Sequence, residues 1–306
     1  MKKWGLNILI LLALILVIWL MANSSKLASQ GDYYKFTVDV DGHNRNYLVY
    51  VPSSYDSNQA VPLVLFFHGG GGSMRRGASD YGWPAKAQAE GFIVAFPNGA
   101  SRWPFDILAT WNAGKCCGYA RDIDSDDVGY TKVVIADLKN RFNILDNQIF
   151  ATGFSNGALM VQRLACELPE ILTAVASVAG TDNTLSCQPS EPISILLIHA
   201  QDDDHVLFSG GSGPGSVRNK ETITEFTSVL ETLERWLKRN KLTSNSRRVW
   251  SHSLAYCDLY ASATSGATEA QVKLCVTETG GHTWPKGRSG LLANDVIWDF
   301  FQLSID

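Results

Sequence analysis

The chain has few charges and no excess of either sign. Only 18% of its 306 residues are charged, and 26 Lys and Arg against 30 Asp and Glu give a formal net charge of -4. Nucleic-acid-binding proteins usually present a broad basic face, so we expect no nucleic-acid partner. The hydrophobic content of 45% is sufficient for one globular domain with a large core.

Several common signatures are also absent. The sequence has no internal repeat and no C-x-x-C pair, and its glycine-rich stretch lacks the Gly-Lys-Ser/Thr ending of a phosphate-binding loop. Asp122, Asp124 and Asp126 resemble the start of a calcium loop, but Asp127 occupies its glycine position and Val133 its final acidic position. We therefore expect neither a cofactor nor a metal.

The N-terminus has the layout of an export signal. Lys2 and Lys3 precede an apolar run over residues 8–22, and a polar linker follows. No Cys follows the run directly, which argues against a lipoprotein. We expect residues 1–30 to be a signal peptide or membrane anchor with its linker, and residues 31–306 to form the globular domain. The protein would then be secreted or periplasmic, either released or held at the membrane by this segment.

The cysteines are even in number, which in an exported protein favours disulfides. They are Cys116, Cys117, Cys166, Cys187, Cys257 and Cys275. Fifteen pairings are possible in principle. Cys257 and Cys275 flank an irregular stretch between two strand-like runs, so we predict that pair, with Cys116 and Cys117 joined to Cys166 and Cys187.

The hydrophobic pattern predicts an α/β fold. Residues 36–40 and 46–51 alternate as an opening hairpin, and they are followed by continuous apolar runs typical of strands buried on both faces. These runs cover residues 62–67, 92–96, 148–152, 173–179 and 193–198. Helical segments alternate with them, most clearly at 126–141, 157–168 and 221–239. The pattern predicts a mostly parallel sheet with helices on both faces and functional residues at the carboxyl ends of its strands.

The sequence GFSNG at 153–157 lies between an apolar strand and an apolar-periodic helix. This G-x-S-x-G pattern is typical of a nucleophile on a strained strand-to-helix turn, where larger flanking residues would collide with neighbouring backbone. The alternative is an ordinary glycine-rich turn. The strand and helix on either side favour Ser155 as a nucleophile.

A serine nucleophile needs a base and a residue that orients the base. Of the six histidines, His282 is the best candidate, because it follows a strand-like run and a Gly-Gly pair near the end of the chain. The acid should lie between the serine and the histidine in sequence, and Asp202, Asp203 and Asp204 follow the run at 193–198. The sequence pattern does not choose among the three, and a cation site that includes His205 is the rival interpretation.

The sequence HGGGGS directly follows the run at 62–67. Glycines there allow backbone N–H groups to turn inward. We predict that the N–H groups of Gly70 and Asn156 form an oxyanion hole. Trp111 and Trp284 are close in sequence to these motifs, and we predict that they line a cleft for an aromatic or polymeric acyl group; the alternative is that they belong to the core or the wall of the domain, where tryptophans are more often found.

Five motifs together resemble secreted esterases of the polyhydroxybutyrate depolymerase and feruloyl or acetylxylan esterase type, in carbohydrate esterase family one. They are HGGGGS, WNAGKCCG with DDVGY, GFSNGA, HAQDDDHV and GGHTWP, over residue 33 to the C-terminus. The resemblance implies an α/β-hydrolase fold, Ser155 as nucleophile, His282 as base and Asp203 as the acid. It also implies that Asp126 and Asp127 cap a helix.

The resemblance implies a serine esterase that works through an acyl-enzyme without a cofactor. Its expected substrates, in order, are feruloyl polysaccharide, acetylated xylan and hydroxyalkanoate polyester. A serine peptidase on the same scaffold is a rival, although no propeller or cap domain is visible in the sequence. A non-catalytic binding protein tethered to the membrane is another, and it would be expected to lack one of the three catalytic residues.

Overall fold

The computed structural model describes residues 31–216, 225–262 and 270–305. The predicted signal or anchor segment lies outside these ranges. Within them, no helix has both the length and the apolar character needed to cross a membrane.

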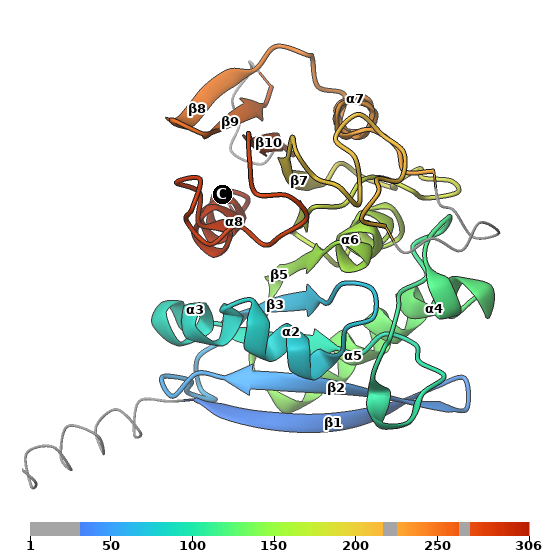
Figure 1. Cartoon of the computed structure of the whole chain (residues 1–306). Helices are drawn as coiled ribbons and strands as arrows, with labels where there is room; N and C mark the ends of the chain where they lie inside the picture. Colours follow the sequence, from blue (N-terminus) through green and yellow to red (C-terminus); the bar gives the residue numbers. More distant parts are fainter. Residues whose placement is uncertain (1–30, 217–224, 263–269, 306) are drawn as a thin grey trace, which may run out of the picture.

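A ten-stranded sheet forms the framework of the molecule (Figure 1). Its strands, in spatial order, are β1 (Asp32–Val40), β2 (His43–Val51), β4 (Ile93–Pro97), β3 (Val61–Phe67), β5 (Ile144–Phe154), β6 (Ala174–Val178), β7 (Ser194–Ala200), β10 (Val272–Thr277), β9 (Ala255–Tyr260) and β8 (Arg247–His252). The six strands from β4 to β10 are parallel, whereas the outer strands pair antiparallel. The mostly parallel sheet and the opening hairpin are as predicted.

Helices cover both faces of this sheet. One face packs against α5 (Asp127–Arg141), α6 (Asn156–Glu167) and α7 (Val229–Arg239). The other packs against α2 (Met74–Asp80), α3 (Trp83–Glu90) and α8 (Ala293–Gln302), with α2 and α3 in front of β2 and β3 in Figure 1. A short helix, α4 (Gly118–Asp122), and a 3-10 turn, η1 (Pro104–Asp106), lie in the connection between β4 and α5.

Strand β3 shows why the apolar runs are continuous. Leu63, Leu65 and Phe67 belong to the core on the α5–α7 side, whereas Val64 and Phe66 belong to the core on the α2–α3 side. Successive side chains of a strand point to opposite faces, so a strand with a core on each face needs an apolar residue at every position.

One detail of the helix predictions is corrected. The helix predicted at 221–239 begins at Val229 among the described residues, and residues 225–228 before it are not helical. Its buried side includes Val229, Leu233 and Trp236, whereas Leu230 is 53% exposed. At α5, Asp126 is the N-cap, and its carboxylate accepts a hydrogen bond from the N–H of Gly129.

The disulfides agree with the prediction in one pair of three. Cys257 and Cys275 are joined, as predicted, across the β9–β10 pair. Cys116 is bonded to Cys117, however, and the third bond joins Cys166 to Cys187. Cys166 lies on α6, and the segment after β6 brings Cys187 to a Cα–Cα distance of 5.2 Å, within the usual range for a disulfide. That pair leaves the two adjacent cysteines as partners of each other.

Candidate active site

Ser155 occupies the turn between β5 and α6. Its backbone has φ of 54° and ψ of -123°, a region that a residue with a Cβ rarely adopts. The turn lies at the carboxyl end of a central strand and presents the serine at the edge of the sheet. This is the strand-to-helix turn predicted from GFSNG.

The glycines on either side of Ser155 are required by close backbone contacts. A Cβ on Gly157 would lie 2.1 Å from the carbonyl oxygen of Phe67, and a Cβ on Gly153 would lie 2.5 Å from that of Gly157. At both glycines, neighbouring backbone approaches so closely that a methyl group would not fit. The sequence pattern therefore has a steric cause.

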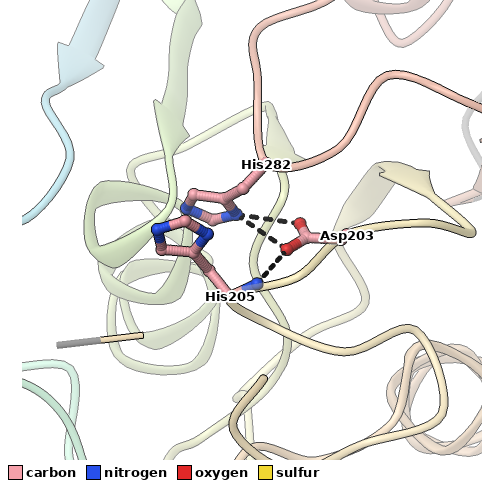
Figure 2. A group of neighbouring side chains, drawn as sticks. All are labelled: Asp203, His205 and His282. Carbon is pink, nitrogen blue, oxygen red and sulfur yellow. Dashed lines mark hydrogen bonds and ion pairs between the residues drawn. The ribbon is translucent and has the colours of Figure 1, made fainter. Parts of the chain in front are cut away.

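The structure brings Ser155, His282 and Asp203 together. The Oγ of Ser155 is 2.8 Å from Nε2 of His282, and Nδ1 of the same ring is 2.8 Å and 3.0 Å from the two carboxylate oxygens of Asp203. Figure 2 shows the contact between His282 and Asp203. Because a carboxylate only accepts hydrogen bonds, Nδ1 of His282 carries the proton and Nε2 is free to accept the serine proton.

Asp203 is buried and surrounded by donors. One of its oxygens accepts hydrogen bonds from the backbone N–H groups of His205, at 2.9 Å, and Val206, at 3.0 Å. The other is 3.3 Å from Nε2 of His199. Burial alone would raise the pKa of Asp203, but the contacts with His199 and His282 outweigh it and hold the pKa well below its usual range. Asp203 therefore stays ionised beside the histidine.

The three adjacent aspartates have different surroundings. Asp202 accepts hydrogen bonds from the N–H groups of Gly280, at 3.2 Å, and Gly281, at 2.7 Å, and so fastens the loop that carries His282. Asp204 is exposed and accepts a hydrogen bond from Nδ1 of His205 at 2.7 Å. Only Asp203 faces His282.

The imidazole of His205 stacks on that of His282. Figure 2 shows one ring lying over the other, and the ring centroids are 4.4 Å apart with planes that differ by 16°. Together with Asp203, these histidines have ligand atoms close enough to suggest a cation site. A histidine binds a metal in the plane of its ring, however, and two stacked, nearly parallel rings cannot both direct a nitrogen at one ion. The arrangement fits a hydrogen-bonded acid and base beside a stacked ring better than a metal centre.

The glycine loop after β3 lies against Ser155 and Asn156. A Cβ on Gly70 would be 3.5 Å from Cβ of Asn156, which is the first residue of α6. The N–H groups of Gly71 and Gly72 already donate to the carbonyls of Ala109 and Gly69. Those two amides are engaged within the fold, so they are poorer candidates for an oxyanion hole than the amide of Gly70.

His68 maintains the shape of this loop. Its Nδ1 donates to the carbonyl of Gly69 at 2.8 Å, and its Nε2 accepts a hydrogen bond from the N–H of Gly99 at 3.1 Å. Burial lowers the pKa of His68 to about 4, an effect that the bond to Gly69 only partly offsets. The ring is therefore neutral at physiological pH and serves as a buried structural link.

The two tryptophans predicted to line a cleft have different positions. Trp284 lines a cavity of about 640 Å³ beside His282, together with Phe154 and Ile198, although Ser155 itself is not part of that lining. Trp111 is fully buried, and its indole N–H donates to the carbonyl of His68 at 2.9 Å. The prediction for Trp111 is wrong, because its ring packs inside the core beneath the glycine loop.

Asn156 has a contact that the sequence did not reveal. Its side chain bridges the backbone of Trp111, accepting from the N–H at 2.8 Å and donating to the carbonyl at 3.0 Å. These bonds tie the start of α6 to the segment that runs beneath the glycine loop. Such a link between residues 45 positions apart has no local sequence signal.

The fold and the arrangement of Ser155, His282 and Asp203 define a class. The chain has the α/β-hydrolase fold, shared with the acetyl xylan esterase from Aspergillus awamori at a TM-score of 0.63, with 14% identity and coverage of 89% of this chain and 100% of that one. A ferulic acid esterase from Anaeromyces mucronatus has a TM-score of 0.55 and 16% identity, covering 90% and 92% of the two chains.

Sequence relatives belong to the same group of esterases. Feruloyl esterase B of Piromyces equi is 28% identical over 261 residues, which are 84% of this chain and 44% of that protein. The bifunctional acetylxylan esterase/xylanase of Neocallimastix patriciarum is 26% identical over 53% of this chain and 22% of its own length. The chain thus spans less than half the length of these two relatives. No protein-family model matches it. The resemblance to feruloyl and acetylxylan esterases is confirmed.

Proposed function

We propose that this protein is an exported serine esterase that hydrolyses feruloyl or acetyl esters of plant polysaccharides. The observation that carries the proposal is the continuous hydrogen-bonded chain from Ser155 through His282 to Asp203, with contacts of 2.8 Å on both sides of the imidazole. The names of the sequence relatives support the choice of ester. Three disulfides and the apolar N-terminal run support export.

In this proposal, the reaction proceeds through an acyl-enzyme. Oγ of Ser155 transfers its proton to Nε2 of His282 and attacks the ester carbonyl carbon. His282 then gives that proton to the departing alcohol oxygen as the ester bond breaks. A water molecule then gives a proton to Nε2 of His282 and attacks the acyl carbon, and His282 returns that proton to Oγ of Ser155 as the bond to the serine breaks and the acid leaves. Asp203 holds the ring in the productive tautomer and stabilises the imidazolium.

The negative charge on the carbonyl oxygen forms beside the start of α6. The first N–H groups of a helix have no carbonyl partner within the helix, and its dipole favours an anion there. We assign the oxyanion contacts to the N–H groups of Gly70 and Asn156. Each such donor contributes about 3 kcal/mol to transition-state stabilisation.

The cavity beside His282 is suited to part of an ester substrate. Its lining includes aromatic and aliphatic side chains such as Trp284 and Ile198, together with threonines and charged residues. The aromatic lining would suit an aromatic acyl group such as feruloyl, which supports feruloyl esters ahead of acetyl esters. Hydroxyalkanoate polyester and peptide are the remaining candidate substrates.

The proposal is tested by comparing the wild type with Ser155→Ala and a control, Ser79→Ala, which alters an exposed serine on α2. Release of p-nitrophenol from short acyl esters should fall by at least about 10³-fold in Ser155→Ala and stay unchanged in the control. Equal rates in the wild type and Ser155→Ala would refute the esterase mechanism. A panel of methyl ferulate, acetylated xylan, polyhydroxybutyrate and a peptide p-nitroanilide then ranks the substrates.

A further inference from the structure

We propose that residues 101–108, here called the apolar loop, bind the polysaccharide chain that carries the ester. This inference rests on the proposed function, because it assigns a second contact for the same polymeric substrate. The loop connects β4 to the segment beneath the glycine loop, and none of its residues belongs to the hydrogen-bonded chain of Ser155.

The apolar loop exposes an unusual concentration of large apolar side chains. Phe105 is 87% exposed, Leu108 54%, Trp103 51% and Ile107 47%. Other exposed apolar residues of the described chain, such as Leu230 and Leu303, lie on separate elements. Single exposed apolar residues are common, whereas four within six positions form a patch that typically marks an interaction site.

Hydrogen bonds hold the backbone of this loop in place. The side-chain amide of Asn98 donates to the carbonyl of Asp106 at 3.1 Å, and that of Asn46 donates to the carboxylate of Asp106 at 2.8 Å. The hydroxyl of Ser101 donates to the carbonyl of Ile107 at 2.5 Å. Asp106 is therefore bonded to residues outside the loop, while four apolar side chains of the loop are exposed.

The backbone conformation is also unusual for these residue types. Phe105, Asp106 and Leu108 have φ values of 64°, 59° and 53°, in the left-handed region that favours glycine. Holding non-glycine residues there costs free energy, and such strain is often found at binding sites. Here it accompanies the outward orientation of the apolar side chains.

The apolar loop is linked by hydrogen bonds, through Ala109 directly after it, to the glycine loop after β3. The N–H of Ala109, which follows it, donates to the carbonyl of Gly72 at 3.1 Å, and the N–H of Gly71 donates to the carbonyl of Ala109 at 2.9 Å. In Figure 1, the segment containing η1 and the loop after β3 lie on the same side of the molecule. The apolar loop is thus joined through Ala109 to the glycine loop, which itself lies against Ser155 and Asn156.

The charge of the loop favours a neutral polymer as its occupant. Arg102 is its only cationic residue, and the guanidinium lies 5.6 Å from the ring of Trp103. Its one acidic residue, Asp106, is bonded to Asn46 and lies 3.8 Å from Nζ of Lys35, a residue outside the loop. An anionic lipid surface would be expected to select a cluster of Lys and Arg. The rings of Trp103 and Phe105 suit the C–H faces of sugar rings, which are apolar although the hydroxyl groups around them are polar.

The experiment compares the wild type with Trp103→Ala, Phe105→Ala and the double variant. Leu230→Ala is the matched control, because Leu230 is similarly exposed but lies on α7. We expect kcat/KM on feruloylated or acetylated xylan to fall about tenfold in the double variant, with methyl ferulate hydrolysis within about twofold of the wild type. Leu230→Ala should match the wild type on both substrates.

A binding assay separates failure of this inference from failure of the proposed function. Ser155→Ala should still sediment with insoluble xylan, and the added loop substitutions should abolish that sedimentation without any need for turnover. Equal losses on methyl ferulate and xylan would show that the loop merely supports the glycine loop. Unchanged xylan binding would overturn the inference, as would loop-dependent binding to phosphatidylcholine vesicles in place of xylan.

Discussion

Substitution of Asp203 by Asn tests the role of the acid directly, because the two side chains have nearly the same shape. One carboxylate oxygen accepts from the backbone amides of His205 and Val206, and Nδ1 of His282 contacts both oxygens, more closely the other one. That other oxygen also lies 3.3 Å from Nε2 of His199, which donates to the carbonyl of Val206 at 2.8 Å. An asparagine has only one oxygen, so its NH2 group must face either the two backbone amides or Nδ1 of His282.

The less costly arrangement keeps the asparagine oxygen on the two backbone amides, since leaving buried N–H groups unpaired is unfavourable. The NH2 group then faces Nδ1 of His282, and the ring must accept there and carry its proton on Nε2. A protonated Nε2 points its hydrogen at Ser155 and cannot take the serine proton. We expect kcat to fall by about 10³- to 10⁴-fold, equivalent to about 4–5.5 kcal/mol in the activation barrier.

The assay is p-nitrophenyl acetate hydrolysis by Asp202→Asn, Asp203→Asn and Asp204→Asn, with circular dichroism to confirm that each variant is folded. Asp202→Asn retains an acceptor for the Gly280–Gly281 turn and should lose only a few-fold in activity, while Asp204→Asn alters an exposed group and should resemble the wild type. If Asp203→Asn keeps more than about a tenth of the activity while either neighbour is inactive, the assignment of the acid is wrong.

Three further predictions concern stability. The pKa of buried His68, about 4, lies below the unfolded value of about 6.5, so the unfolded chain binds the proton at a higher pH than the folded protein does. The free energy of unfolding should therefore fall by about 3 kcal/mol as the pH drops from 6.5 to 4, as measured by urea unfolding. Gly157→Ala should prevent soluble expression or lower Tm strongly, because its methyl group would meet the carbonyl of Phe67. Replacing Cys257 and Cys275 by Ala should cost about 3 kcal/mol, measured by denaturant unfolding.

Each of these has its own control. A His68→Asn variant should have a flatter dependence of stability on pH between 4 and 6.5, and an unchanged slope would assign the effect to other groups. The control for Gly157→Ala is Gly72→Ala, whose methyl group would meet the carbonyl of Gly69 and the ring of His68. This variant should disturb the glycine loop more than the junction between β5 and α6. Peptide mapping without reduction checks the pairing, and a Cys116–Cys187 peptide would contradict the bonds described here.

Local sequence patterns were sufficient to predict the strands and to select Ser155 and His282 as candidates. The run at 62–67 is apolar at every position because β3 has a core on each face, and this composition is visible without any tertiary information. GFSNG can be recognised in the same way, because the close approach of backbone at Gly153 and Gly157 excludes every other residue type there. His282 could be predicted from its place after the last strand of the parallel set.

Long-range contacts decided the rest. Trp111 is predicted to line a cleft from its place next to a motif, yet its ring is buried and its indole N–H donates to the carbonyl of His68, 43 positions away. The pairing of Cys166 with Cys187 depends on which segment passes α6. Neither of these contacts has a periodic or local signature in the sequence.

By itself, the sequence determined the alternation of strand and helix and the residue types of the catalytic motifs, because backbone geometry and burial on two faces restrict which residues can occupy those positions. The sequence pattern left the three adjacent aspartates undistinguished and only the family resemblance pointed to Asp203, whereas the tertiary structure separated their contacts and revealed the apolar loop. Residues next to one another in sequence point in different directions, and their roles depend on which distant backbone and side-chain groups the fold places against them.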